Sequence, residues 1–343
     1  MRVVVTGAAG FLGRLLVGEL LRAPSLAGVP VTRLVLVDRV SWREGSVPVE
    51  PWVRVVSGEL AGCLDEVFGE PVDVVFHLAA AVSAECEADF DLGMRVNVDT
   101  TRALLEAARA QAARGGPVVR VVFTSSLAVY GPLPGGGVPA AVDETTLPVP
   151  RSSYGTQKLM CEHLIADMTR RGFVDGRVVR LMTVAVRPGA PNAAASGFLS
   201  SIVREPLAGR PAVCPVSPEL KVALASPRST VRAVLRVAEA ERGSGPGQLE
   251  GTAAVNVPAL TVSVADMLVT LRTVAGAGAA GLVTVSPDPA VEAVVGSWPA
   301  VFDHRRATDL GLAPDPDFES LVRAYIADHP EAVAPEHRGG RPG

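Results

Sequence analysis

The chain is poor in the residues that build metal centres or disulfide frameworks. Its 343 residues include four cysteines and five histidines. The cysteines, at positions 63, 86, 161 and 214, have neither CxxC nor metal-ligand spacing, and the histidines are equally dispersed. We therefore expect the cysteines to be small core residues, and we predict neither a disulfide nor a bound metal.

Long apolar runs and clustered basic residues are missing as well. No apolar stretch approaches the roughly 20 residues of a membrane span. The first residues run from a Val-rich strand into glycines, without the pattern of a signal peptide. A net charge of −4 with no cluster of Lys and Arg argues against nucleic acid as a partner. We expect a cytoplasmic protein with neither a membrane nor a nucleic-acid partner.

What the sequence does contain, over its first half, is an alternation of Val-rich runs and amphipathic stretches. Short, continuous apolar runs are typical of strands buried on both faces, and helices between them form the crossovers of a parallel sheet. The pattern predicts an α/β fold with a doubly wound parallel sheet of the Rossmann type. The predicted strands are 3–5, 31–38, 53–56, 72–78, 118–125, 177–186 and 252–257, and the predicted helices 11–22, 63–68, 97–114, 155–171 and 229–242.

Prolines interrupt this alternation between residues 187 and 227. Such a change in composition indicates a second lobe. We predict a dinucleotide-binding domain formed by residues 1–186 and 228–258, and a smaller, interleaved C-terminal substrate lobe formed by residues 187–227 and 259–330. Residues 331–343, rich in Pro, Gly and charge, are expected to fray.

A glycine-rich loop follows the first predicted strand. Gly7 permits a tight turn, Gly10 lets the backbone approach a pyrophosphate, and Gly13 lets the next helix pack closely on the sheet. The helix then directs free N–H groups and its positive dipole end toward the phosphates. The strand before the loop and the helix after it support a dinucleotide site; the loop reads Thr6-Gly7-Ala8-Ala9-Gly10-Phe11-Leu12-Gly13.

Asp38 ends the second predicted strand, where a carboxylate accepts hydrogen bonds from the adenosine ribose and repels a 2′-phosphate. This position favours NAD over NADP, although Arg39 follows directly and offers a cation for that phosphate. His77 ends a later strand. We interpret it as a histidine packed beside the cofactor rather than as a catalytic group.

Tyr154 and Lys158 lie four residues apart at the start of a predicted helix, and therefore on one face of it. An ammonium beside a phenol favours the phenolate, so we expect a lowered pKa for Tyr154 and a role as general base. Ser126 ends a buried strand 28 residues earlier. There its hydroxyl can hold a substrate alcohol while Tyr154 takes the proton.

Together the TGxxGxxG, HLAA, SSxxVYG and YxxxK motifs resemble the extended short-chain dehydrogenases over roughly residues 1–260. The resemblance implies Ser126, Tyr154 and Lys158 as catalytic residues and NAD as the cofactor. It places Asn97 at a structural asparagine position that supports a proton relay, and Glu59, in place of a more usual Asp, at the adenosine. The implied cofactor-binding residues are Gly7, Gly10, Phe11, Leu12, Asp38, Glu59, Leu60, Leu78, Ala79, Ala80, Asn97, Tyr154 and Lys158.

Residues 151–240 depart from the nucleotide-sugar epimerases and dehydratases and are similar to the D-erythronate dehydrogenases. The resemblance implies NAD-dependent oxidation of a small sugar acid at its C2 hydroxyl. Arg187 and Arg228 are candidates for the carboxylate, because a guanidinium binds a carboxylate bidentately; Asn192 and Ser83 are candidates for hydroxyls. Polar contacts within the lobe explain the same residues equally well. A nucleotide-sugar 4-epimerase or dehydratase, and a non-catalytic NAD-binding regulator, are the alternatives.

The resemblance also implies a homodimer. Related enzymes pair through the helices that correspond to residues 100–114 and 155–171, with twofold symmetry. Leu104, Leu105, Leu159 and Ile165 are apolar residues on those helices, although burial within the monomer is an equally simple account of them.

Overall fold

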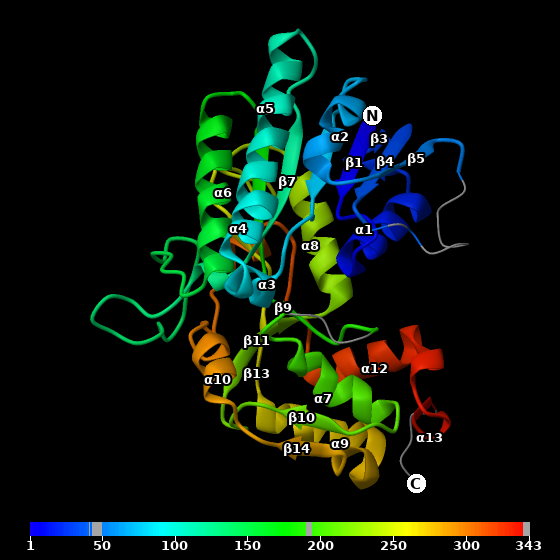
Figure 1. Cartoon of the computed structure of the whole chain (residues 1–343), viewed down its shortest axis with the longest axis vertical. Helices are drawn as coiled ribbons and strands as arrows, with labels where there is room; N and C mark the ends of the chain where they lie inside the picture. Colours follow the sequence, from blue (N-terminus) through cyan, green and yellow to red (C-terminus); the bar gives the residue numbers. More distant parts are fainter. Residues whose placement is uncertain (41, 43–49, 190–193, 339–343) are drawn as a thin grey trace.

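The computed structural model describes residues 1–40, 42, 50–189 and 194–338. Figure 1 shows a large α/β lobe that contains the N-terminus and a smaller lobe below it that contains α7, α9 and α12. Among the described residues, no helix combines the length and the apolar character needed to cross a bilayer.

A seven-stranded parallel sheet forms the centre of the large lobe, with the strand order β12-β8-β7-β6-β1-β4-β5. The order reverses at β1, which has β6 on one side and β4 on the other, so the sheet is doubly wound as predicted. The strands are β1 (Arg2–Thr6), β4 (Arg33–Asp38), β5 (Val53–Ser57), β6 (Val74–His77), β7 (Arg120–Ser126), β8 (Asp175–Leu181) and β12 (Val255–Asn256).

The Val-rich strands are buried because both faces of the sheet are covered. Side chains alternate between the faces of a strand. Val3 and Val5 accordingly belong to one hydrophobic core, and Val4 belongs to the other. The same alternation separates Leu34 from Val35. A strand with apolar residues at every position is therefore stable only between two helical layers, as the sequence pattern predicts.

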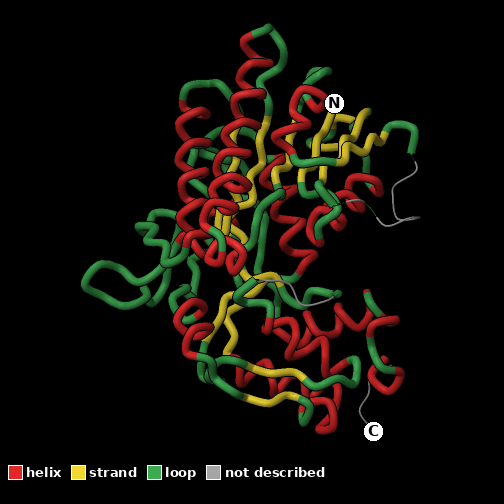
Figure 2. The backbone as a smooth tube through the Cα atoms, viewed as in Figure 1, coloured by secondary structure: helices red, strands yellow, loops and turns green. Residues whose placement is uncertain are grey.

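Helices flank the strands of this sheet in Figure 2. Each helical layer is assembled from segments that are distant in sequence. On one face α1 packs beside α8, and on the other α5 packs against α2 and α6. These helices are α1 (Phe11–Arg22), α2 (Leu60–Val67), α5 (Thr100–Ala113), α6 (Ser153–Arg170) and α8 (Pro227–Glu239). The remaining elements of this lobe are β2 (Ser25–Leu26), β3 (Val29–Pro30), α3 (Ser83–Ala88), α4 (Phe90–Gly93), a π-helical turn at Met94–Asp99 and a 3-10 turn at Leu127–Val129.

The small lobe has its own hydrophobic core, in which Val203, Leu271 and Tyr325 come from three different helices. Two short sheets border it, one with the strand order β13-β11-β9 and one that pairs β10 with β14. Its elements are β9 (Thr183–Val184), α7 (Phe198–Leu207), β10 (Ala212–Cys214), β11 (Lys221–Ala225), β13 (Leu260–Ser263), α9 (Val264–Ala280), β14 (Val283–Val285), α10 (Pro289–Val295) and α12 (Phe318–Asp328).

Two C-terminal segments differ from the sequence prediction. Phe302 and Leu310, assigned to the substrate lobe, pack in the core of the large lobe, and Val142 forms a parallel bridge with Phe302. Short helices at α11 (Arg305–Asp309), Pro330–Ala332 and α13 (Pro335–Arg338) complete this part of the chain. The first residues of the tail that was expected to fray are held in place: Val333 is buried in the small-lobe core, and the Ala334 amide donates to the Leu207 carbonyl at 2.8 Å.

Candidate active site

The loop between β1 and α1 requires its glycines. Gly7 has φ +69°, and a Cβ added there would lie 2.7 Å from the backbone nitrogen of Ala79. A Cβ at Gly13 would lie 2.1 Å from the Gly7 carbonyl oxygen. The backbone of the loop is therefore not covered by side chains next to the first turn of α1. A pyrophosphate can approach the backbone N–H groups at such a loop. The residues present fit a dinucleotide.

One pocket lies beside this loop, at the carboxyl ends of β1 and β4. Asp38 lines it and accepts hydrogen bonds from the amides of Ala9 and Val40, both at 2.9 Å. Its carboxylate is thus held at the rim of the loop, where the sequence places the adenosine ribose. Seven more of the predicted cofactor residues line the same pocket: Gly7, Gly10, Glu59, Leu60, Leu78, Ala79 and Ala80.

His77 is fully buried behind this pocket. Its Nδ1 lies 2.7 Å from the Thr6 hydroxyl, and its Nε2 lies 2.9 Å from the Thr101 hydroxyl. Thr101 donates its own proton to the Asn97 carbonyl, so it accepts from Nε2–H. Burial, with a smaller contribution from the Lys158 charge, lowers the pKa of His77 to about 3. His77 is therefore a neutral core residue that joins β1 and β6 to the helix behind them.

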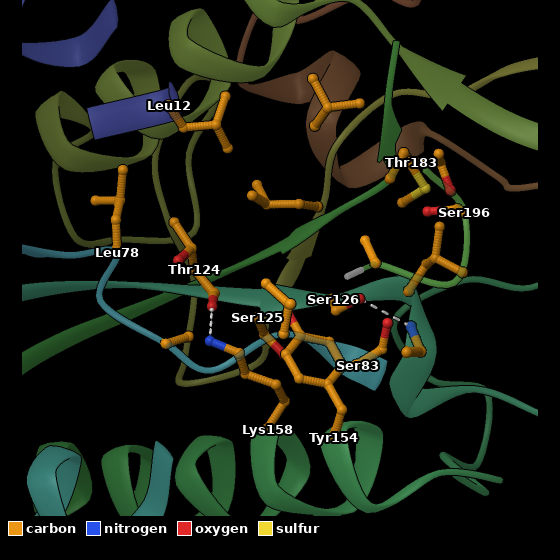
Figure 3. A pocket seen from close by; sticks show the side chains of 18 of the residues that line it. Leu12, Leu78, Ser83, Thr124, Ser125, Ser126, Tyr154, Lys158, Thr183 and Ser196 are labelled. Atoms are coloured by element: carbon orange, nitrogen blue, oxygen red, sulfur yellow. Dashed lines mark hydrogen bonds between the residues drawn. The ribbon is translucent and has the colours of Figure 1, made fainter. Parts of the chain in front are cut away.

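A second pocket opens on the other side of the glycine loop, between the two lobes. Ser126, Tyr154 and Lys158 all line it, together with the loop residues Phe11 and Leu12. Figure 3 shows Tyr154 and Lys158 directed from α6 toward the end of β7, which carries Ser126. The structure thus brings together the three residues that the motifs single out.

Lys158 is held by the strand beneath the pocket. Its ammonium donates to the Thr124 carbonyl at 2.8 Å and lies 4.6 Å from the centre of the Phe123 ring. Burial lowers the pKa of Lys158 to about 8. The ammonium lies 5.7 Å from the centre of the Tyr154 ring.

The pKa of Tyr154 differs from the sequence expectation. Burial, and next the charge of Cys86, raises it to about 12, while a hydrogen bond with Ser126 and the charge of Arg187 act in the opposite direction. The prediction that Lys158 lowers this pKa is wrong for the chain described here, because desolvation of the phenolate outweighs the nearby positive charges.

Asn97 lies behind the pocket wall rather than in it. Its side-chain carbonyl accepts from the Ala81 amide at 2.8 Å, and its amide donates to the Ala81 carbonyl at 3.2 Å and to Gln157 at 2.8 Å. The π-helical turn at 94–99 carries Asn97 in this position. Its contacts join the segment after β6 to the helix of Tyr154, so its place is structural rather than at the cofactor surface.

Arg187 lines the second pocket from the small lobe. Burial, and next the charge of Arg204, lowers the pKa of its guanidinium, whereas Tyr154 raises it. Within residues 1–40, 42, 50–189 and 194–338, no carboxylate forms an ion pair with this guanidinium. Ser83 lines the same pocket, and its hydroxyl accepts from the Ala195 amide at 3.1 Å.

Arg228 does not join the pocket. It lies on the exposed side of α8, where its side chain is 67% exposed and forms an ion pair with Asp328. The prediction that it contacts the substrate is therefore corrected: its charge is compensated by a residue that is distant in sequence. Asn192, the other candidate from this lobe, lies outside the described residues.

Several residues of this pocket were not predicted from the sequence, among them Thr183, Ser196 and Trp298. Thr183 follows β8, Ser196 precedes α7, and Trp298 comes from the segment after α10. Figure 3 places Thr183 and Ser196 close together on the wall opposite Tyr154. Thr183 lies two residues beyond the end of a buried strand, and this position could have predicted it as a site residue. Nothing in the local sequence around Ser196 or Trp298 predicts that they line the pocket.

Comparisons with known proteins agree with this geometry. The model of the NAD dependent epimerase/dehydratase family matches residues 3–249. The chain is 47% identical to a D-erythronate dehydrogenase from Cupriavidus necator over 96% of its own length and 98% of the relative's. It is 40% identical to a D-erythronate dehydrogenase from Haemophilus influenzae, over 95% and 99% of the two chains.

A solved structure described as a nucleoside-diphosphate-sugar epimerase from Agrobacterium tumefaciens has a TM-score of 0.86 and 38% identity, and the match covers 97% of this chain and 95% of that one. A structure of MoeE5 in complex with UDP-glucose and NAD has a TM-score of 0.73 and 26% identity, over 97% and 100% of the chains. The glycine loop, the Asp38 pocket and these matches lead to one conclusion: the chain belongs to the NAD dependent epimerase/dehydratase family, and it is an oxidoreductase that uses NAD.

Proposed function

We propose that the protein oxidises a free sugar acid at its C2 hydroxyl, converting D-erythronate or a close analogue to the 2-keto acid with reduction of NAD. The observation that carries the proposal is the Arg187 guanidinium, which lines the same pocket as Tyr154 and Ser126 and has no carboxylate partner among the described residues. A small acid supplies the missing anion. The two relatives named D-erythronate dehydrogenase, similar over nearly their full lengths, support the same substrate.

In this proposal Ser126, Tyr154 and Lys158 each have a separate role in the reaction. Ser126 holds the C2 hydroxyl, and Tyr154 as the phenolate removes its proton. NAD, when bound, supplies the acceptor for the hydride that leaves C2. Lys158, fixed by Thr124, keeps a positive charge beneath the site, and the charge of Arg187 opposes the cost of burying the phenolate.

Two alternatives remain less favoured. A nucleotide-sugar epimerase needs contacts for a base and a diphosphate, and the relatives that match nearly the whole chain at 47% and 40% identity bear the name of a dehydrogenase. A non-catalytic NAD-binding regulator has no use for Ser126, Tyr154 and Lys158 assembled in one pocket.

Replacement of Arg187 tests the proposal. Loss of a guanidinium that faces a desolvated carboxylate costs about 2–5 kcal/mol, so Arg187→Ala is expected to raise KM for the acid by roughly 30- to 4,000-fold. Arg228→Ala is the matched control, because it removes an arginine that pairs at the surface with Asp328. Steady-state kinetics should show an unchanged KM for the control and unchanged NAD affinity for both. Equal KM values for Arg187→Ala and the wild type would remove the carboxylate assignment.

We also propose a cytoplasmic homodimer, with α5 and α6 at the interface. The support is the resemblance to paired enzymes; Leu104, Leu105 and Ile165 do not contribute, because they are buried within the monomer. Met160 on α6 is 43% exposed and is available to such an interface. Light scattering is expected to give twice the 35.5 kDa chain mass, and a monomer would refute the dimer.

A further inference from the structure

We propose that Arg204 is a positioning residue that fixes Arg187 in the pocket, so that the two arginines together form a dedicated carboxylate-binding unit. The inference rests on the proposed function, because it concerns how the same site distinguishes a free acid from a neutral substrate.

Helix α7 holds the backbone of Arg187 on both sides. The Ser200 hydroxyl accepts from the Arg187 amide at 3.1 Å, and Arg204 Nη1 donates to the Arg187 carbonyl at 2.9 Å. Ser200 and Arg204 are four residues apart and therefore lie on one face of the helix. Both are buried, at 1% and 4% exposure. The position of Arg187 is thus determined by α7 rather than by the loop that carries it.

Arg204 is itself held at every nitrogen of its guanidinium. Nε donates to Glu205 Oε1 at 2.9 Å, and Nη2 donates to the Ser201 hydroxyl at 3.1 Å. Glu205 also accepts from Arg210 through its other oxygen at 2.7 Å. One carboxylate is therefore shared by two arginines and only partly compensates the buried Arg204 charge beside Arg187, whereas the charge of Arg210 is exposed to solvent.

The buried charge of Arg204 repels the Arg187 guanidinium. Burial and the Arg204 charge both lower the pKa of Arg187. A guanidinium nevertheless stays protonated at working pH, so the repulsion is not relieved by loss of a proton. A carboxylate bound to Arg187 relieves it, whereas a hydroxyl or an amide does not. The pair consequently favours free acids over neutral sugars of the same size.

The experiment compares Arg204→Gln with Arg210→Gln on two substrates. Arg210 pairs with the same Glu205, but its side chain is 60% exposed, and within the described part of the chain it donates no hydrogen bond to the Arg187 backbone. The substrates are D-erythronate and its primary amide, which keeps the hydroxyls and lacks the charge. We expect Arg204→Gln to raise KM for the acid about tenfold or more, with kcat within about threefold, while KM for the amide stays unchanged. Arg210→Gln should leave both KM values unchanged.

Two more variants guard against a folding defect at the buried Arg204. Arg204→Lys keeps the charge and should recover part of the loss, and Ser200→Ala removes only the other backbone contact and should raise KM for the acid by a few fold. Thermal melting and NADH binding monitor the fold. The inference is overturned if Arg204→Gln leaves KM for the acid unchanged, or if it impairs acid and amide alike. If Arg187→Ala raises KM and Arg204→Gln does not, the proposed function stands and only this inference fails. If the wild type oxidises no acid, both fail.

Discussion

Lys158 is a buried cation, and its replacement is expected to increase stability at neutral pH while abolishing activity. The side chain is 2% exposed, and burial lowers its pKa from 10.5 to about 8. At 1.36 kcal/mol per pKa unit, the folded state loses about 3 kcal/mol wherever the lysine is charged in both the folded and the unfolded chain. Lys158→Met removes this cost and also the hydrogen bond to Thr124, whose unpaired carbonyl costs about 1–3 kcal/mol.

The pH dependence separates these two contributions. Below pH 8 the lysine is protonated in both states, and the wild type bears the full cost. Between pH 8 and 10.5 the unfolded chain holds more protons than the folded one, so the free energy of unfolding of the wild type rises with pH. The lost hydrogen bond has no such dependence. Between pH 8 and 10.5 the free energy of unfolding of the wild type should therefore rise by about 3 kcal/mol relative to that of Lys158→Met.

Urea unfolding of both proteins at several pH values between 7 and 11 measures this difference directly. Lys221→Met is the control, because it removes a lysine that is exposed at the start of β11 and therefore bears no cost of burial. If the free energies of unfolding of Lys158→Met and the wild type differ by the same amount at every pH between 8 and 10.5, the reasoning is refuted, because burial then does not hold the pKa of Lys158 near 8.

The remaining predictions concern the cofactor site and the phenol. Tyr154→Phe keeps the ring and removes the base, so NADH binding should persist while kcat falls about 100- to 10,000-fold, as measured by steady-state kinetics. Asp38→Ala should narrow the preference for NAD over NADP in kcat/KM, because the repulsion of a 2′-phosphate is lost. Gly13→Ala should lower both the melting temperature and NADH affinity in a fluorescence titration, because its Cβ would meet the Gly7 carbonyl at 2.1 Å. Gly18→Ala on the same helix has no atom within 4 Å of its Cβ and should retain both.

The large lobe could be predicted from the sequence because its signals are local. The Val-rich runs predict strands, since apolar residues at every position require burial on both faces. Helix α1 begins and ends where its apolar periodicity does, at Phe11 and Arg22. The YxxxK spacing lies within one helical turn and the serine ends a buried strand, and these local signals identify Ser126, Tyr154 and Lys158, which the structure brings into one pocket.

The small lobe and its part of the site could not be predicted in the same way, because they depend on contacts between distant residues. The exposed pair of Arg228 with Asp328 joins positions 100 residues apart, and nothing near Arg228 indicates it. The pairing of β10 with β14 involves strands of three residues each, too short for a periodic signal. Trp298 lines the pocket and packs against the cores of both lobes, which are formed by residues distant from it in sequence.

Oxidation of a sugar acid by the wild-type protein is the most direct test of the proposed function. The assay follows NADH formation with a panel of aldonic acids and, in parallel, with UDP- and dTDP-sugars. NADH should accumulate with D-erythronate or a close analogue, in step with a 2-keto acid, and should not accumulate with the nucleotide sugars. Interconversion of a UDP-sugar without net release of NADH, together with no oxidation of any acid, would contradict the proposal and favour an epimerase.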